Sequence, residues 1–218
     1  QEKTKVQVGS LVAEMIKRRL YATGIKDAIV PTRLSATGTE LFAKVYAKPI
    51  AFPFDGFSTA RGNAAETCEQ FTRELLAGRL DYGWITSCAP KVKNRAVEVL
   101  ERTWGVFTQK GDVTRRPANT AVRSIMEKWD KMLADGERRL PIATVLRDVC
   151  MPPHGANIAS AGLLLGVFVA PRAKDLALAR DGAQTALSEW IQEGLFRGRF
   201  IDLEGQEGVD LVSIGGAS

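Results

Sequence analysis

The side chains best suited to nucleophilic chemistry in this sequence are one histidine and three cysteines. His154 follows Cys150 by four residues, a spacing that could join a thiol nucleophile to an imidazole base. Pro152 and Pro153 stand between them, so we expect Cys150 to end a helix and His154 to lie on the turn that follows. A turn histidine packed against the helix end is the simpler interpretation. We therefore predict no catalytic residue in this chain.

A second candidate is the stretch GFSTARGN, from Gly56 to Asn63, which approaches a phosphate-binding loop and precedes a predicted helix. Its glycines are one residue too far apart and the Lys-Ser/Thr pair is missing, so nothing holds a terminal phosphate and its Mg²⁺. The free N–H groups and the dipole at the helix start still favour an anion. We predict an anion site at Arg61, Gly62 and Asn63, with a simple turn between helices as the favoured alternative.

Basic side chains are the third candidate. The net charge of +5 and the pI near 9.2 permit contact with nucleic acid or an acidic partner without requiring it. Most clusters are interrupted by acidic residues, which is typical of a solvated surface. Arg197 and Arg199 are the most suggestive, because they enter a predicted hairpin near the C-terminal end. As an alternative function, we predict that four basic residues of this region contact DNA phosphates: Lys174, Arg180, Arg197 and Arg199.

Aromatic residues are concentrated in a proline-containing stretch around Phe52, Phe54 and Phe57. Together with Trp84 and Trp104 they could stack on unpaired bases. A loop packed onto neighbouring helices explains the same residues more simply, and it is the interpretation that we favour.

The composition is that of an ordinary soluble globular protein, with 45% hydrophobic and 25% charged residues. Cys68, Cys88 and Cys150 are odd in number and widely spaced, so we expect reduced thiols, no metal and a cytoplasmic protein. The longest apolar run, from Ile158 to Ala170, is too short to span a membrane. The first residues lack a signal-peptide core and an initiator Met, which suggests a processed chain or a piece of a larger protein.

Helical spacing of apolar residues dominates the first 137 residues. Val12, Ile16 and Leu20 mark a first helix that Gly24 ends. Further helices are expected from Thr39 to Lys48, from Asn63 to Gly78, from Pro90 to Trp104 and from Pro117 to Gly136. No strand-like alternation is long enough to build a sheet, so we expect a helical domain over residues 1–137.

The pattern changes from residue 138 onward. We first expect a short amphipathic helix carrying Ile142, Val145, Leu146 and Val149, followed by a tight turn at Pro152–Gly155. Two further helices are expected, one from Ala156 to Ala170 and one from Asp175 towards Gly194. The chain then forms a hairpin of Phe200–Leu203 with Val209–Ile214. The helix that starts at Ala156 is apolar on all sides, so it should be buried.

Three helices followed by a two-stranded wing is the order of a winged-helix domain, which we place at residues 138–218. The predicted class is therefore mainly α, with a helical N-terminal region and a winged-helix-like C-terminal domain carrying a small β-hairpin. A recognition helix must present polar side chains to base edges. The apolar helix offers almost none, and the helix after it offers mainly Lys174, Arg180, Gln184 and Gln192. This favours docking of a partner protein at least as much as contact with DNA.

One stretch resembles a known family. Leu140 to Gly155, LPIATVLRDVCMPPHG, and the apolar helix through Phe168 resemble an L…L…PPYG…LLLA pattern of large bacterial P-loop ATPases in phage-defence systems of the BREX and Pgl type. Phe54–Phe57 and Asn94–Ala96 are similar to the helical region before that pattern. His154 stands where the family has Tyr, and the Walker A motif is absent. The resemblance implies a non-catalytic helical and winged-helix portion, with ATP hydrolysis elsewhere.

We therefore predict a non-enzymatic interaction or adaptor module of a larger bacterial defence or DNA-handling assembly. Its partner would be a protein or a larger ATPase assembly, and we expect no cofactor and no membrane contact. The alternative is a DNA-binding protein that contacts the phosphate backbone through its winged helix. An enzyme built on Cys150 and His154 is a third possibility, which full activity after His154→Ala would remove.

Overall fold

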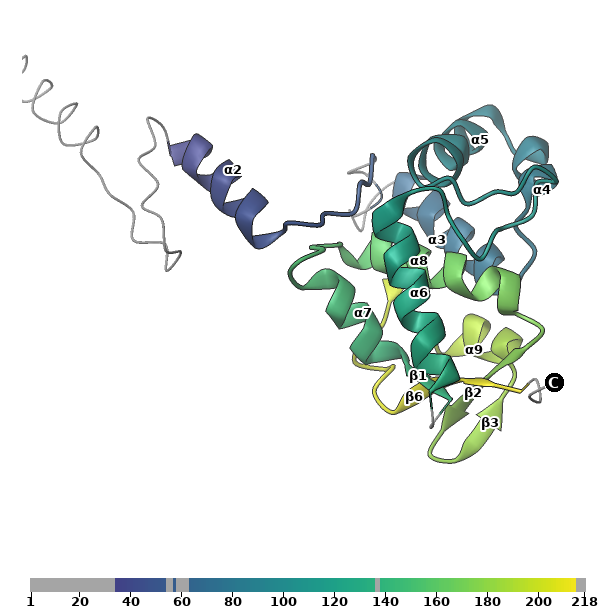
Figure 1. The fold of residues 1–218 in the computed structure, drawn as a ribbon. Coiled ribbons are helices and arrows are strands. Elements are labelled where there is room, and N and C mark those ends of the chain that lie inside the picture. The colour runs from purple at the N-terminus through teal and green to yellow at the C-terminus, as the bar shows by residue number, and fades with distance from the viewer. Residues whose placement is uncertain (1–33, 54–56, 58–62, 136–137, 215–218) are drawn as a thin grey trace, which may run out of the picture. The chain divides into compact units, whose positions relative to one another are not determined.

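The computed structural model describes residues 34–53, 57, 63–135 and 138–214 (Figure 1). The chain divides into two units, one up to Ala47 and one from Lys48 onward. The boundary expected between residues 137 and 138 lies inside the second unit.

The described helix of the first unit is α2 (Leu34–Val45), where a helix was expected from Thr39 to Lys48. The Tyr46 amide donates to the carbonyl of Phe42 just beyond its last residue, and the two rings lie 4.5 Å apart. The helix expected around Val12, Ile16 and Leu20 lies outside the described residues.

The second unit is mainly helical and holds a small antiparallel sheet, which confirms the predicted class at this level. Its helices are α3 (Asn63–Leu76), α4 (Tyr82–Ser87), α5 (Pro90–Ala96), the π-helix η2 (Val97–Thr103), α6 (Thr120–Ala134), α7 (Ile142–Cys150), α8 (Ile158–Val169), the 3-10 turn η3 (Ala170–Arg172) and α9 (Leu187–Glu193). Its strands are β1 (Arg139–Pro141), β2 (Leu176–Arg180), β3 (Ala183–Thr185), β4 (Phe196–Arg197), β5 (Phe200–Ile201) and β6 (Val209–Ser213).

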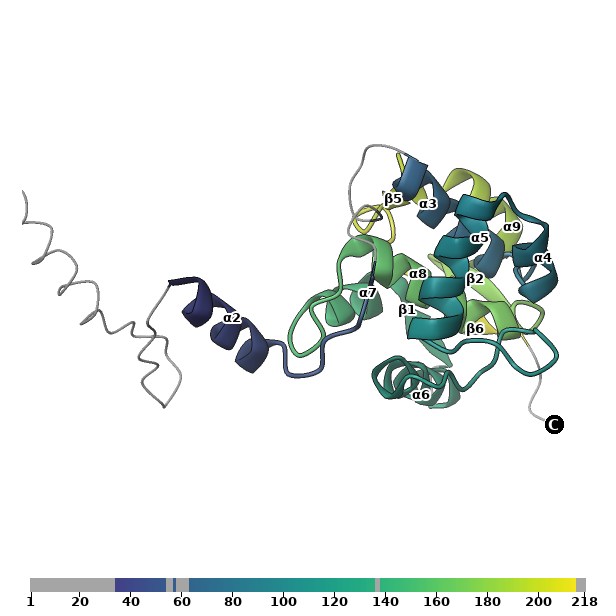
Figure 2. The same ribbon diagram turned by 90° about the horizontal axis from the view of Figure 1, so that it is seen from above.

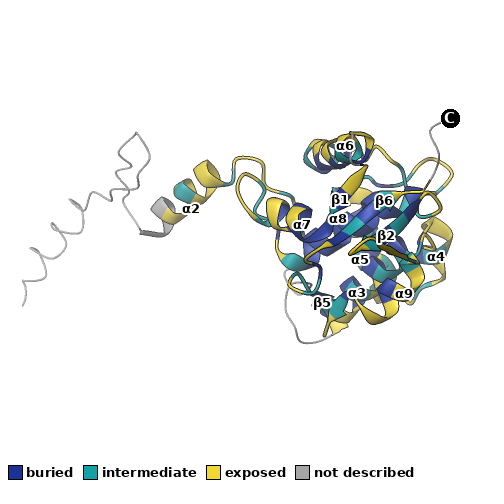
Figure 3. Ribbon diagram, turned by 90° about the horizontal axis from the view of Figure 1, so that it is seen from below, coloured by how far each residue is buried: buried dark blue, intermediate teal, exposed yellow. Residues whose placement is uncertain are grey.

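The apolar helix α8 lies in the middle of the second unit, where Figure 3 draws it dark blue. Every residue from Ala159 to Val169 is buried, which confirms the burial predicted from its composition. The Asn157 side chain accepts a hydrogen bond from the Ser160 amide and so caps the helix start. Because an all-round apolar helix gains stability only when it is covered on every face, neighbouring elements must enclose α8.

Three helices provide this enclosure. Seen from above, α6 lies on one side of the second unit and α3 on the other (Figure 2). From α6, the Trp129 ring meets Phe168 of α8 edge to face, with ring centroids 5.4 Å apart. α3 crosses α8 where Gly162 and Gly166 leave room for Thr72 and Leu75. α7 packs against α8 as well.

The main sheet has the strand order β1-β6-β2-β3, and all its neighbours are antiparallel. β6 therefore lies between β1 and β2, with Leu211 opposite both Leu140 and Leu178. These three leucines are buried, so the central pairs of the sheet contribute to the same core as α8.

The helix expected from Asp175 towards Gly194 is wrong in its first half, which forms the β2–β3 hairpin. Leu176 and Leu178 are buried, whereas Ala177 and Ala179 are partly exposed, and this period of two is that of a strand. Asp181 and Gly182 have φ values of 50° and 82°, as a two-residue hairpin turn requires. The pair Asp181-Gly182 is typical of a two-residue hairpin turn, and the predicted helix did not take it into account.

The hairpin expected between Phe200–Leu203 and Val209–Ile214 is also wrong in its pairing. β5 pairs with β4 across a turn at Gly198, and β6 pairs with β1 and β2 instead. The physical reason is burial: β6 alternates buried Val209 and Leu211 with less buried residues, so it is stabilised as an inner strand facing the core.

Two predicted helix starts depend on prolines, and only one is confirmed. Pro90 is the first residue of α5, where its missing N–H costs nothing. Pro117, in contrast, precedes α6 by three residues, because Asn119 is the cap. The Asn119 side chain accepts from the amides of Ala121 and Val122, which satisfies two donors that Pro117 could not.

The aromatic stretch packs onto the helices, as the favoured interpretation predicted. Phe57 and Trp104 are fully buried, and the Phe52 ring lies 5.5 Å and 6.1 Å from theirs. The Trp104 indole Nε1 donates to the carbonyl of Ala51 at 2.7 Å, which fixes the loop to the end of η2. Phe54 lies outside the described residues.

Candidate functional site

The four basic residues predicted to contact DNA occupy different environments. Arg199 lies 3.7 Å from a carboxylate oxygen of Glu66 and 3.9 Å from one of Glu69, both on α3. Arg180 donates from Nη2 to the carbonyl of Gly205 at 2.5 Å. Lys174 and Arg197 are exposed, and neither makes an ion pair within the described part of the chain. Lys174 precedes β2 and Arg180 ends it, so the length of that strand separates them.

Of the predicted anion site, the structure describes Asn63 alone, while Arg61 and Gly62 lie outside the described residues. Asn63 is the first residue of α3. Its carbonyl accepts from the Arg95 Nη1 at 3.0 Å and from the Thr67 hydroxyl at 2.6 Å. Arg95 thus ties α5 to the start of α3, and the anion site stays a prediction.

His154 and Cys150 lie where the sequence places them, on the turn and at the end of α7. The Nδ1 of His154 lies 3.0 Å from the carbonyl oxygen of Lys48, so the ring is bonded to the incoming chain. Burial raises the pKa of the Cys150 thiol, which disfavours a thiolate. Both observations favour a structural turn over a nucleophile–base pair.

A groove of about 200 Å³ lies between the β2–β3 hairpin and α9. Its floor is apolar and consists of Leu178, Trp190 and Val209, all of which are buried. The polar residues that line it are Arg180, Thr185, Glu189 and Glu193, and Gly194 completes the wall. Leu178 and Thr185 are opposite each other in the hairpin, and Val209 is opposite Arg180, so one face of the sheet forms the floor.

The buried side chain of Gln206 fixes α9 above this floor. Its Oε1 accepts from the Trp190 Nε1 at 2.7 Å, and its Nε2 donates to the carbonyl of Gly194 at 2.8 Å. Gln206 and Trp190 are both buried, so the indole N–H depends on Gln206 rather than on water. The groove is therefore a preformed feature of the folded unit.

Gln206→Ala is expected to lower the free energy of unfolding by about 2 kcal/mol, because it leaves the buried Trp190 N–H without a partner and removes the hydrogen bond to the Gly194 carbonyl. Urea unfolding followed by tryptophan fluorescence measures the change. Gln192→Ala, at an exposed position on α9, is the control and should change stability by less than about 0.5 kcal/mol. Equal losses of stability in the two variants would mean that the hydrogen bonds of Gln206 do not stabilise the position of α9.

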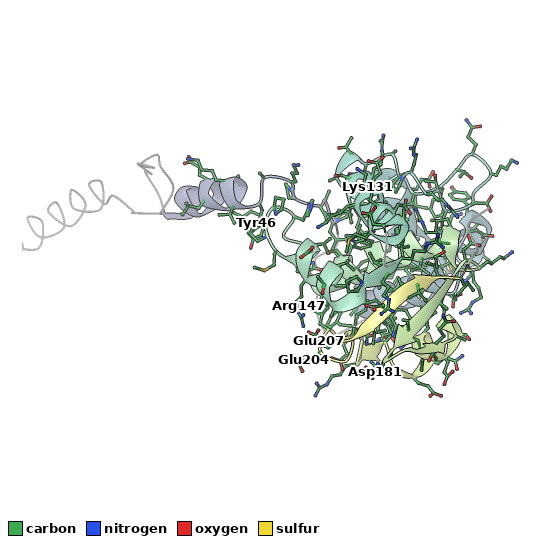
Figure 4. The ribbon with its side chains drawn as sticks, turned by 60° about the horizontal axis from the view of Figure 1, so that its bottom comes forward. Tyr46, Lys131, Arg147, Asp181, Glu204 and Glu207 are labelled. Carbon is green, nitrogen blue, oxygen red and sulfur yellow. The ribbon has the colours of Figure 1, made fainter. Side chains whose placement is uncertain are left out.

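The groove belongs to a segment of unusual charge, residues 181–208, which we call the β2–β6 segment. It contains six carboxylates and two arginines, a net charge of −4 within a chain of +5. The carboxylates are Asp181, Glu189, Glu193, Asp202, Glu204 and Glu207. Asp181, Glu204 and Glu207 lie along one edge of the second unit in Figure 4. Glu207 forms an ion pair with Arg147.

Sequence reasoning missed Glu189 and Glu193, although their spacing was a signal. Like charges one turn apart on a helix cost stability, so a pair with no compensating cation is worth attention. Neither carboxylate has an ion pair or hydrogen bond to any residue that the structure describes. Both line the groove and are exposed.

Comparison with known proteins gives no relative. No protein-family model matches this chain, and no curated protein or solved structure shows significant similarity to it. Within the described ranges, no three His, Cys, Asp or Glu side chains are grouped so that they could hold a metal ion. Among the helices that the structure describes, none is both long enough and apolar enough to cross a membrane.

Proposed function

We propose that residues 120–214 form a winged-helix-like domain with an enlarged wing, and that it serves as an interaction module. The order α6, β1, α7, α8, β2, β6 and the sheet order β1-β6-β2 support the domain assignment. The β2–β6 segment occupies the position of the wing. The domain then begins with α6, before the boundary expected at residue 138.

The burial of α8 is the observation that carries the proposed function. In a winged helix, α8 would be the helix that enters the major groove of DNA. Here no residue from Ala159 to Val169 is exposed, and α3 packs directly across Gly162 and Gly166. α8 cannot reach a base edge unless α3 leaves, which would expose the core of the unit. A surface other than α8 must therefore contact the partner.

The resemblance to phage-defence ATPases supports a place in a larger assembly. The residues that carry it, Leu140 to Gly155, form β1, α7 and the turn before α8, and most of their apolar side chains are buried. They therefore specify a fold more than a reactive site. The function we propose is a non-enzymatic module that docks a partner protein in a bacterial defence or DNA-handling assembly.

The test is reconstitution with an identified partner. A photo-crosslinking residue is placed at Ser188 of α9 or, in a separate variant, at Lys131 of α6, both of which are exposed. The captured protein is then purified and mixed with the chain. A complex of fixed stoichiometry that resists nuclease treatment supports the proposal. Failure to form any protein complex, or nucleotide turnover by the isolated chain that a point substitution abolishes, would overturn it.

DNA backbone contact through the wing is the second candidate, favoured by the exposed Lys174 and Arg197. Each phosphate contact that is lost should flatten the plot of log affinity against log salt by about 0.9. Under the leading proposal, the double substitution Arg197→Ala and Arg199→Ala leaves weak duplex binding and its salt slope unchanged, because the β2–β6 segment is acidic overall. Fluorescence anisotropy with a labelled duplex at several salt concentrations measures both quantities. A flatter slope in the double variant would favour the DNA-binding function instead.

A further inference from the structure

The groove between the β2–β3 hairpin and α9 combines an apolar floor with two carboxylates that have no partner in the described chain. Glu189 and Glu193 lie one helical turn apart at its rim, next to the buried Trp190. Arg180 also lines the groove, but its guanidinium is bonded to the Gly205 carbonyl. The rim therefore holds two negative charges against one positive charge that is already bonded.

The size of the groove indicates what it accommodates. About 200 Å³ is less than the roughly 300–1,000 Å³ of sites that enclose small-molecule ligands. It suits a single long side chain. An arginine places its aliphatic stem on apolar residues and its planar guanidinium against carboxylates, to which it can bond in pairs.

The free edge of β3 supplies a way to present such a side chain. β3 is the last strand of the main sheet, and its residues Ala183 and Gln184 are exposed. In the hairpin register, Ala183 and Thr185 pair with β2 through hydrogen bonds, so the N–H and C=O of Gln184 are directed outward. An extended segment that pairs there would place a side chain opposite Thr185, on the face that lines the groove.

We propose that this groove binds an arginine of an extended, basic segment in the partner protein. The inference rests on the proposed function as an interaction module and names the chemistry of the partner. The acidic β2–β6 segment attracts a basic chain from a distance, and Glu189 and Glu193 then hold its guanidinium over the apolar floor beside Trp190.

The test is an NMR titration of the ¹⁵N-labelled full chain with four short peptides, Ac-Ser-Val-Xaa-Val-Ser-NH₂, where Xaa is Arg, Lys, Gln or Glu. The signals are the Trp190 indole N–H, assigned with Trp190→Phe, and the amides of Gln184 and Thr185. We expect saturable shifts with the Arg peptide, at least tenfold weaker binding of the Gln peptide and no shift with the Glu peptide. Lys should bind more weakly than Arg, because an ammonium lacks the planar fork.

The control variants separate charge recognition from apolar contact. The double substitution Glu189→Gln and Glu193→Gln should abolish the preference for Arg over Gln, and thermal unfolding shows that the variant is folded. Glu127→Gln, an exposed acidic residue of α6, should leave the preference intact. Equal binding of the Arg and Gln peptides, or an Arg preference that survives the double substitution, overturns the inference, and so does the absence of a saturable shift.

Failure of this inference and failure of the proposed function give different results. If a reconstituted partner binds the chain but the Arg peptide does not, another surface is the docking site and the module function stands. If the Arg peptide binds but no protein complex forms in the reconstitution, the groove recognises arginine and the proposed function fails.

Discussion

Gly166→Leu is expected to lower the free energy of unfolding by about 3 kcal/mol, because it forces a side chain into the crossing of α3 and α8. A Cβ at position 166 would lie 2.9 Å from the Leu75 Cβ and 3.4 Å from the Thr72 carbonyl oxygen. Both atoms belong to or adjoin the α3 backbone, so only a movement of the helix relieves the contact. Urea unfolding with a fitted slope measures the loss, and tryptophan fluorescence reports whether the core stays closed.

Gly162→Ala is a control on the same helix with a smaller introduced side chain. Its Cβ would also approach to 2.9 Å, but the neighbour is the Ile201 Cδ1, the far end of a flexible side chain. A helical Gly→Ala change gains up to about 1 kcal/mol of propensity, so this variant should remain within about 1 kcal/mol of the parent. If Gly166→Leu unfolds at the same urea concentration as Gly162→Ala, α3 does not seal α8 as described.

Asp130→Ala should also lower the free energy of unfolding by about 3 kcal/mol, because it leaves the buried guanidinium of Arg172 without its carboxylate partner. The Arg172 side chain is only 5% exposed, and it donates from Nε and Nη2 to the two carboxylate oxygens of Asp130 at 2.9 Å and 2.6 Å. Burial lowers the pKa of Arg172, and the bonds and charge of Asp130 oppose that shift. Removing one partner of a buried pair typically costs 3–5 kcal/mol, roughly. The lower end applies because the Asp130 side chain is 45% exposed and because the Phe168 carbonyl still accepts from Nη1.

An exposed ion pair on neighbouring elements serves as the comparison. Lys128 and Asp148 lie 3.0 Å apart, and both side chains are about half exposed. Asp148→Ala should therefore change the free energy of unfolding by less than about 0.5 kcal/mol. Thermal and urea unfolding of both variants separate the two cases. Similar losses for Asp130→Ala and Asp148→Ala would mean that burial does not decide the strength of these pairs.

Local signals predicted α7 and α8. The stripe of Ile142, Val145, Leu146 and Val149 is buried in α7, and Gly155 follows the double proline with a positive φ of 63°. Each of these features depends on residues that are close together in the chain, so it can be predicted from the sequence alone. The buried α8 follows the same logic, since its composition leaves no polar face.

Strand pairing and side-chain partners were not accessible in that way. Val209–Ile214 was expected to pair with Phe200–Leu203, but β6 pairs with β1 and β2, which lie farther away in the sequence. No local pattern indicates that Arg172 is buried, because its partner, Asp130, stands 42 residues earlier. The groove was missed for the same reason, because Trp190, Val209 and Leu178 meet only after the sheet forms.

The central place of β6 has a consequence for synthesis of the chain. β1 has no other strand to pair with in the described sheet, so after it leaves the ribosome it waits until Val209–Ser213 is made. At roughly 5–20 residues per second, that delay is on the order of seconds. α3, however, is translated before α8 and is available to cover it as it emerges. The order of the elements therefore allows α3 to cover the apolar helix α8 in the nascent chain before the sheet is complete.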